Sequence, residues 1–194
     1  VLRIFHIPEA EAIILSLQIN SQNKNTNELV FFSILVFPKI SSPAFDEPIN
    51  FKSREIVTQG ELSDAAAALD WIERQNLDYS QCWVSGFSFG SLICMQLIMR
   101  RPEINNFVAV SPQPNVYDFS FLAPCPTSGQ VIYSENDELV TKESINELDK
   151  RIKNQKGVEV IFSKIKNSNH FFKNKEKDLV LEIEKYIKEK TALI

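Results

Sequence analysis

The chain has 194 residues, of which 44% are hydrophobic and 24% charged, a balance typical of a globular protein with a sizeable core. The net charge of −4 at pH 7 argues against a nucleic-acid partner, and no apolar run approaches the roughly 20 residues of a membrane span. The three cysteines lack metal-ligand spacing, which favours free thiols in a reducing cytoplasm.

The N-terminal third predicts two strands. Residues 11–20 alternate between apolar and polar side chains, as in a half-buried strand, and residues 29–37 form a continuous apolar run typical of a buried strand. We expect the two to pair in antiparallel fashion through the polar loop between them. Residues 38–48 contain three prolines, which exclude a helix, and residues 49–57 fit either a short strand or an irregular segment.

From Gly60 onward, predicted helices and strands alternate. The helices cover residues 61–75, beginning near Ser63 and Asp64, then a stretch after Gly90 that ends near Arg101, then residues 141–153 and 175–190. The strands cover residues 81–85, 107–110, 130–133 and 158–165. This alternation predicts a mostly parallel sheet covered by helices on both faces, with ligands at the carboxyl ends of its strands.

The segment Gly86-Phe87-Ser88-Phe89-Gly90 fits the pattern Gly-x-Ser-x-Gly between an apolar run and an apolar helical pattern. This is the context of a nucleophile elbow, a tight strand-to-helix turn that raises a serine hydroxyl above the end of a sheet. Ser88 is therefore the candidate nucleophile, and the backbone N–H of Phe89 is a candidate donor to an oxyanion. The alternative is a glycine-rich turn that carries a solvated serine.

A nucleophilic serine needs a base that an acid holds in the right tautomer, and α/β-hydrolases carry these groups in the order serine, acid, histidine. Only two histidines are present, and His170 follows the last predicted strand, whereas His6 precedes every predicted strand. Order thus favours His170 as the base, against the alternative of a packed loop histidine. Asp137 follows the next-to-last strand and is the candidate acid, unless this turn is merely a solvated acidic loop. The competing carboxylates are Glu135, Glu138 and Asp118.

Taken together, these segments resemble the small bacterial hydrolases of the α/β superfamily that are related to dienelactone-hydrolase-like and peptidase-like members. The similarity covers about two thirds of the chain and is carried by residues 60–66, 86–90, 117–126 and 169–172. It implies that Ser88 is the nucleophile, Asp137 the acid and His170 the base. It also implies action on an ester, a thioester or a related acyl bond.

The N-terminal third departs from that family, which carries a His-Pro-His-Pro loop with following glycines that supplies a second oxyanion N–H. Residues 36–43 stand at this place and contain neither His nor Gly, so the backbone N–H of Lys39 is the candidate second donor. Residues 37–49 leave no room for a crossover helix. We expect one domain, residues 1–194, with a divergent part at 1–59 and a family-like core at 60–194. Its expected fold is an α/β-hydrolase-like three-layer sandwich with N-terminal antiparallel strands and one crossover helix missing.

The resulting expectation is a cytoplasmic serine hydrolase with a small-molecule acyl substrate, no cofactor, no metal, and no nucleic-acid or membrane partner. The alternative is a catalytically weak or inactive homologue that binds a ligand or partner in the same cleft. A third reading is a structural domain that forms a homodimer through apolar surface left by the missing helix. Four aromatic residues either line an apolar pocket or belong to the core: Phe87, Phe89, Phe119 and Phe121.

Overall fold

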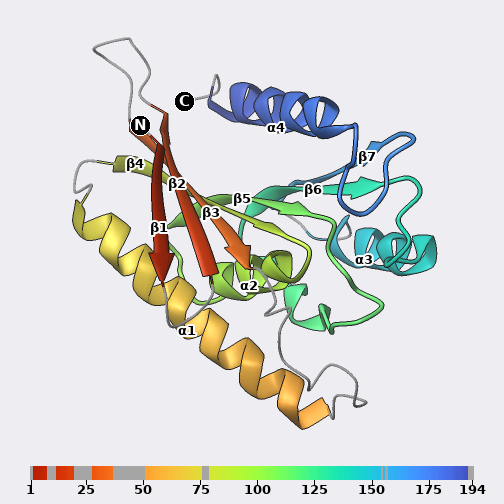
Figure 1. Cartoon of the computed structure of the whole chain (residues 1–194), viewed down its shortest axis with the longest axis horizontal. Coiled ribbons are helices and arrows are strands. Elements are labelled where there is room, and N and C mark those ends of the chain that lie inside the picture. Colours follow the sequence, from red (N-terminus) through yellow and green to blue (C-terminus); the bar gives the residue numbers. More distant parts are fainter. Residues whose placement is uncertain are drawn as a thin grey trace.

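A computed structural model describes residues 2–7, 12–19, 28–36, 51–75, 79–153, 155 and 157–191. A seven-stranded sheet lies at its centre, and the strands are adjacent in chain order from β1 to β7 (Figure 1). The strands are β1 (Leu2–Ile7), β2 (Ala12–Ile19), β3 (Glu28–Val36), β4 (Tyr79–Phe87), β5 (Ile104–Val110), β6 (Ser128–Ser134) and β7 (Val160–Ile165). The helices are α1 (Phe51–Gln75), α2 (Phe89–Ile98), α3 (Lys142–Lys153) and α4 (Glu176–Thr191), with a short 3-10 helix, η2 (Ser120–Leu122).

The pairing of neighbouring strands changes once along the sheet, from antiparallel to parallel. The pairs β1–β2 and β2–β3 are antiparallel, and the second confirms the pairing predicted for residues 11–20 and 29–37. From β3 to β7 every neighbouring pair is parallel. The sequence did not predict β1, because its apolar residues occupy both alternating positions and are interrupted by Arg3 and His6, so no period-two signal arises. Residues 37–50, where a crossover helix was expected to be missing, lie outside the described residues.

Helix α1 begins at Phe51 and runs to Gln75, so two expectations were wrong. The segment that we assigned to a short strand or an irregular stretch is helical from residue 51, and Ser63 lies inside the helix rather than at its start. Gly60 also lies within α1, exposed to solvent, where an added Cβ would meet nothing within 4 Å. An interior glycine costs about 1 kcal/mol relative to alanine, which a helix of 25 residues accommodates.

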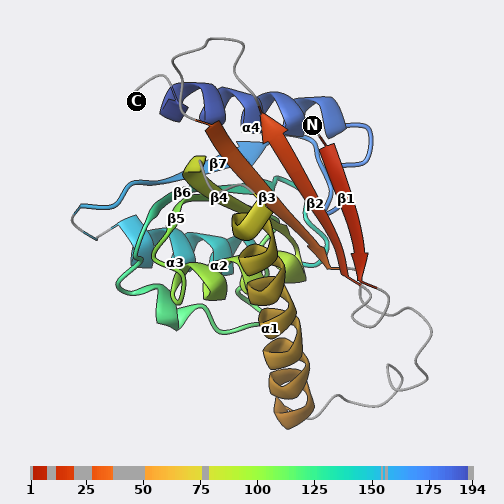
Figure 2. The same cartoon turned by 90° about the vertical axis from the view of Figure 1, so that its left-hand side faces the viewer.

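The helices cover the two faces of the sheet unequally, with α1, α2 and α3 on one face and α4 on the other (Figures 1 and 2). Successive residues of a strand point to opposite faces. In β4, Val84 accordingly packs with the cluster under α1 and α2, while Trp83 packs with the cluster under α4. In β5 the same division separates Phe107 from Val108. The central strands are therefore buried on both sides, as the predicted three-layer sandwich requires.

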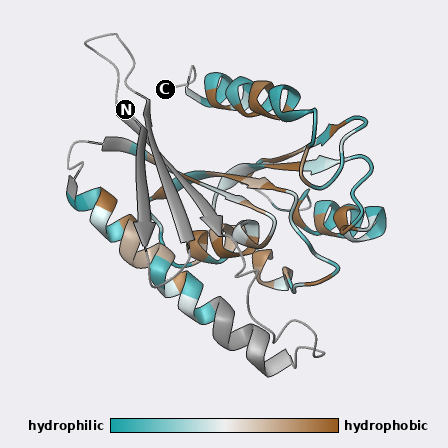
Figure 3. Cartoon of the chain, in the orientation of Figure 1, coloured by the Kyte–Doolittle hydropathy of each residue, from teal (hydrophilic) through white to brown (hydrophobic). Residues whose placement is uncertain are grey.

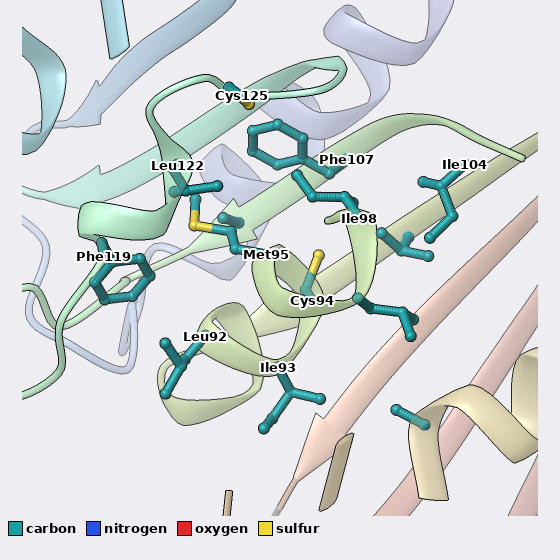
Figure 4. Packing of buried hydrophobic residues seen from close by; sticks show 14 of the residues in the cluster. Leu92, Ile93, Cys94, Met95, Ile98, Ile104, Phe107, Phe119, Leu122 and Cys125 are labelled. Carbon is teal, nitrogen blue, oxygen red and sulfur yellow. The ribbon is translucent and has the colours of Figure 1, made fainter. Parts of the chain in front are cut away.

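Helix α2 is the most deeply buried helix among those described. Hydrophobic residues are concentrated on α2 and the central strands, whereas α4 carries both hydrophobic and hydrophilic residues (Figure 3). Met95 of α2 is fully buried, and the helix packs beside Phe107, Phe119 and Leu122 (Figure 4). Phe119 is thus a core residue rather than a pocket residue. None of the described helices combines the length and the apolar character that crossing a bilayer requires.

Candidate active site

Ser88 alone forms the turn between β4, which ends at Phe87, and α2, which begins at Phe89. Its φ of 53° and ψ of −115° are sparsely populated by residues with a side chain, so the surrounding structure must hold this conformation. The Ser88 N–H donates to the carbonyl of Val110 at 2.8 Å. The Ser88 carbonyl accepts from the N–H and the hydroxyl of Ser91, at 3.0 and 2.6 Å. Bonds from β5 and α2 therefore fix the strained turn.

The glycines on either side of Ser88 allow strand and helix to approach closely. A Cβ added at Gly86 would lie 2.0 Å from the carbonyl oxygen of Gly90 and 2.7 Å from the N of Ser91. No real Cβ tolerates such contacts, so a side chain at Gly86 would push α2 away from β4. The elbow geometry that the motif predicts is therefore present.

His170 lies in the loop after β7, with its side chain 1% exposed. Its Nε2 is 2.9 Å from the Ser88 Oγ, and its Nδ1 is 3.0 and 2.9 Å from the two carboxylate oxygens of Asp137. Three residues from three separate loops are thus linked by hydrogen bonds. All three loops follow the carboxyl ends of parallel strands, where the sheet topology predicts a ligand site.

The main chain of His170 is fixed from two directions. Its N–H donates to the Glu138 Oε2 at 3.0 Å, and its carbonyl accepts from the Ser111 hydroxyl at 3.1 Å. Ser111 directly follows β5, whose last residue, Val110, holds the N–H of Ser88. The end of β5 therefore contacts the backbone of both Ser88 and His170.

Asp137 follows β6, and its side chain is only 6% exposed. Its carboxylate accepts from the Ser134 hydroxyl at 3.0 Å and from the N–H groups of Leu139 and Val140 at 2.9 and 3.0 Å. Burial alone would raise the pKa of Asp137, but the hydrogen bonds from His170 and Leu139 outweigh it and place that pKa below its usual value. An ionised Asp137 favours the tautomer with hydrogen on Nδ1, which leaves the His170 Nε2 to accept the Ser88 hydroxyl proton.

The competing residues are engaged elsewhere. Glu135 accepts from the Asn167 N–H at 3.0 Å, and Asp118 accepts from the N–H and hydroxyl of Ser120 at 2.7 Å each. Glu138 contacts the main chain of His170, as described above. His6 belongs to β1 at the edge of the sheet, three strands away from β4.

Of the two candidate oxyanion donors, only the N–H of Phe89 belongs to the described residues. Phe89 opens α2, and the N–H groups of a helix's first turn have no acceptor within the helix and lie at the positive end of its dipole. Because Phe89 directly follows Ser88 in the chain, its N–H lies next to the nucleophile, where an oxyanion donor is needed. Lys39 falls outside the described residues.

Two phenylalanine rings lie against the imidazole. The rings of Phe87 and His170 have centroids 5.5 Å apart, and the Phe171 ring meets His170 edge-on at 5.1 Å. Sequence reasoning missed the positions of Ser111 and Ser134 in the site, and it placed Phe171 beside His170 only in the alternative of a packed loop histidine. The first two could have been found by asking which hydroxyls end parallel strands, because that edge of a sheet collects functional groups.

Other chemistries have less support in the described part of the chain. The three cysteines are free and buried, as expected, and burial together with Glu73 and Glu103 raises the pKa of the Cys82 thiol to about 12. Such thiols are poor nucleophiles. Across the described ranges, no group of three or more His, Cys, Asp or Glu side chains is placed to hold a metal ion.

Comparisons with known proteins identify the family of the chain. The model of the dienelactone hydrolase family matches residues 41–193. Uncharacterized protein RP471 of Rickettsia prowazekii is 42% identical over 132 residues, which are 66% of this chain and 56% of that relative. The match thus spans little more than half of the relative's length.

Solved structures show the same fold. ATU1826 of Agrobacterium tumefaciens, a protein of unknown function and candidate α/β hydrolase, is 33% identical with a TM-score of 0.71, covering 98% of this chain and 96% of that one. Est1E of Butyrivibrio proteoclasticus is 13% identical with a TM-score of 0.66, covering 100% and 99% of the two chains, and supports the fold alone. The chain therefore belongs to the dienelactone hydrolase family of α/β hydrolases.

Proposed function

We propose that the protein is a serine hydrolase that cleaves an ester, thioester or related acyl bond of a small molecule through Ser88, His170 and Asp137. One observation carries the proposal. The His170 Nε2 lies 2.9 Å from the Ser88 Oγ, while its Nδ1 is held by Asp137. This is the nucleophile–base–acid relationship that activates a serine hydroxyl. The proposed setting is the cytoplasm, without a nucleic-acid or membrane partner.

In the proposed reaction, the Ser88 Oγ attacks the acyl carbon while the His170 Nε2 takes the hydroxyl proton. The tetrahedral intermediate places its negative oxygen near the N–H of Phe89. Collapse breaks the bond to the leaving group, which receives the proton from Nε2 and departs as an alcohol or thiol. Water then attacks the acyl-Ser88 ester, again giving a proton to His170, and the released Ser88 Oγ recovers it. Asp137 stabilises the transient imidazolium in both halves.

A weak or inactive homologue that binds a ligand in the same site is the second candidate function. It is favoured by the absence of His and Gly in residues 36–43, where the family carries its second oxyanion donor. We propose the N–H of Lys39 for that donor. Loss of one such donor typically lowers turnover by about 100- to 1000-fold. The two functions therefore differ in rate rather than in the residues around Ser88.

Labelling with a fluorophosphonate probe separates them, because the probe reacts with an activated serine beside a usable oxyanion site. We expect the wild type to be labelled and Ser88→Ala to be unlabelled. Ser120→Ala is the matched control, since Ser120 is an exposed serine bonded to Asp118, and it should label like the wild type. A folded wild type that stays unlabelled would contradict an active hydrolase and favour the binding homologue.

A further inference from the structure

Phe171 is 62% exposed although it directly follows His170. Scattered exposed apolar residues are ordinary on a protein surface, so exposure alone indicates little. This ring, however, meets the His170 imidazole edge-on, with centroids 5.1 Å apart and planes at 82°. It also lies 6.0 Å from the ring of Phe87, the residue before Ser88. The two phenylalanines thus form an aromatic wall, Phe87 and Phe171, beside the proposed reacting atoms.

The backbone on both sides of Phe171 is fixed. His170 is held through its N–H by Glu138 and through its carbonyl by Ser111. On the other side, Phe172 is 1% exposed, packs in the cluster under α4 and donates its N–H to the Asn169 carbonyl at 3.0 Å. The Phe171 ring is therefore presented to solvent by a loop already held in place. A preorganised apolar surface of this kind loses little conformational freedom when a ligand covers it.

The position of the aromatic wall determines which half of the substrate lies against it. His170 itself is 0% exposed, whereas Ser88 is only partly buried, so the reactants approach from the side of Ser88. The base must return its proton to the departing atom, which therefore lies within hydrogen-bond reach of the His170 Nε2. Phe171 packs against this same imidazole. The group attached to the departing oxygen or sulfur thus lies nearest the aromatic wall.

We propose, on the basis of the proposed function, that Phe171 and Phe87 form the leaving-group subsite and that it takes flat apolar groups, above all aromatic alcohols or thiols. Aromatic rings pair in edge-to-face or offset geometry, which the half-exposed wall offers to an incoming ring. The acyl half of the substrate, bonded to Ser88 in the intermediate, faces away from Phe171. The preference is therefore expected for the alcohol and not for the acid.

Benzyl acetate and ethyl acetate test this, because they differ in the alcohol but form the same acetyl-enzyme. We expect the wild type to prefer benzyl acetate, and Phe171→Ala to lower kcat/KM for it about tenfold, mainly through KM, while sparing ethyl acetate. Leu181→Ala is the matched control, since Leu181 is also 62% exposed but lies on α4, which supplies no residue to the site. Phe171→Leu keeps apolar bulk without a ring and should recover part of the loss.

Three results would overturn the subsite. Equal losses on both acetates, with a displaced pH profile, would mean that Phe171 only shields His170. A loss on ethyl phenylacetate but not on benzyl acetate would place the wall beside the acyl group. A wild type that hydrolyses neither acetate and takes no fluorophosphonate overturns the proposed function and the subsite together, and this is seen before any variant is made.

Discussion

The hydroxyl of Ser111 donates a hydrogen bond to the main-chain carbonyl of His170 across 3.1 Å, although the two residues are 59 positions apart in the chain. Ser111 is 1% exposed and His170 0% exposed, so the His170 carbonyl has no access to water when the hydroxyl that donates to it is lost. A net hydrogen bond is worth about 1 kcal/mol, which corresponds to roughly fivefold in a rate. Ser111→Ala should therefore slow the labelling of Ser88 about fivefold through misplacement of His170, measured as the second-order rate with the fluorophosphonate.

Ser111→Gly distinguishes this positioning role from a merely structural one. The φ of Ser111 is 47°, a left-handed value that costs a residue with a Cβ about 1–2 kcal/mol and glycine almost nothing. Both variants lose the hydroxyl and should label equally slowly. The free energy of unfolding should be about 1 kcal/mol higher for the glycine variant than for the alanine variant. If the glycine variant labels faster than the alanine variant, the labelling rate depends on stability and not on the hydroxyl. This result would argue against a positioning role.

The approach of Gly86 to Gly90 gives a second prediction. Gly86→Ala places a Cβ 2.0 Å from the Gly90 carbonyl oxygen, so α2 must shift. Overpacking of this kind costs about 1–3 kcal/mol, and because the shift moves Ser88, probe labelling should be lost even where the protein remains folded. Urea unfolding and labelling, carried out on the same samples, measure the two effects.

Gly60→Ala is the matched glycine substitution. A Cβ at Gly60 meets nothing within 4 Å and lies on an exposed turn of α1. It should raise the free energy of unfolding by about 0.5–1 kcal/mol, because alanine favours the helix, and leave labelling unchanged. A destabilised Gly60→Ala would contradict the helical assignment of this part of α1.

Local periodicity predicted most of the fold. The strands from β2 to β7 and the helices α2 to α4 appear close to their predicted ranges, because buried parallel strands and amphipathic helices have strong short-range patterns. The first turns of α1 were missed because Gly60 resembled a boundary, whereas helix propagation passes through a single glycine. Residues 49–57 themselves contain neither glycine nor proline, so no helix breaker stands among them.

Chain order predicted which residues gather at the site, because Ser88, Asp137 and His170 each follow a parallel strand and such ends meet at one edge. It could not predict the supporting contacts. Ser111 bonds to His170, which adjoins it only in the folded chain, and the turn after β6 decides whether the Ser134 hydroxyl reaches Asp137 three residues later. Phe171 has the same sequence character whether buried or exposed. The catalytic roles of the three residues stay a prediction.

Arg101 gives a stability prediction away from the site. Its guanidinium, 18% exposed, bonds to Asp70 at 2.6 Å and Glu73 at 2.9 Å on α1, and also to Glu103 before β5. Lysine offers a single point charge in place of this planar fork. Arg101→Lys should lower the free energy of unfolding by about 1–2 kcal/mol, measured by urea denaturation, while the folded fraction labels at the wild-type rate. Lys188→Arg is the matched control at an exposed position, and it should alter neither the free energy of unfolding nor the labelling rate.

The pKa of Asp137 predicts how stability depends on pH. Its folded value lies below the usual value of about 4, so the unfolded chain binds this proton more readily than the folded protein. The stabilising contribution of the carboxylate is therefore complete above pH ~4 and is lost as pH falls through the lower folded pKa. The difference in unfolding free energy between wild type and Asp137→Asn should shrink as pH falls below 4, as measured by urea denaturation at each pH. Asp118→Asn removes an exposed carboxylate that is also hydrogen-bonded and should change far less, because solvent screens it. A difference for Asp137→Asn that grows in acid would show that the folded protein holds this carboxyl protonated, and that His170 lacks an ionised partner.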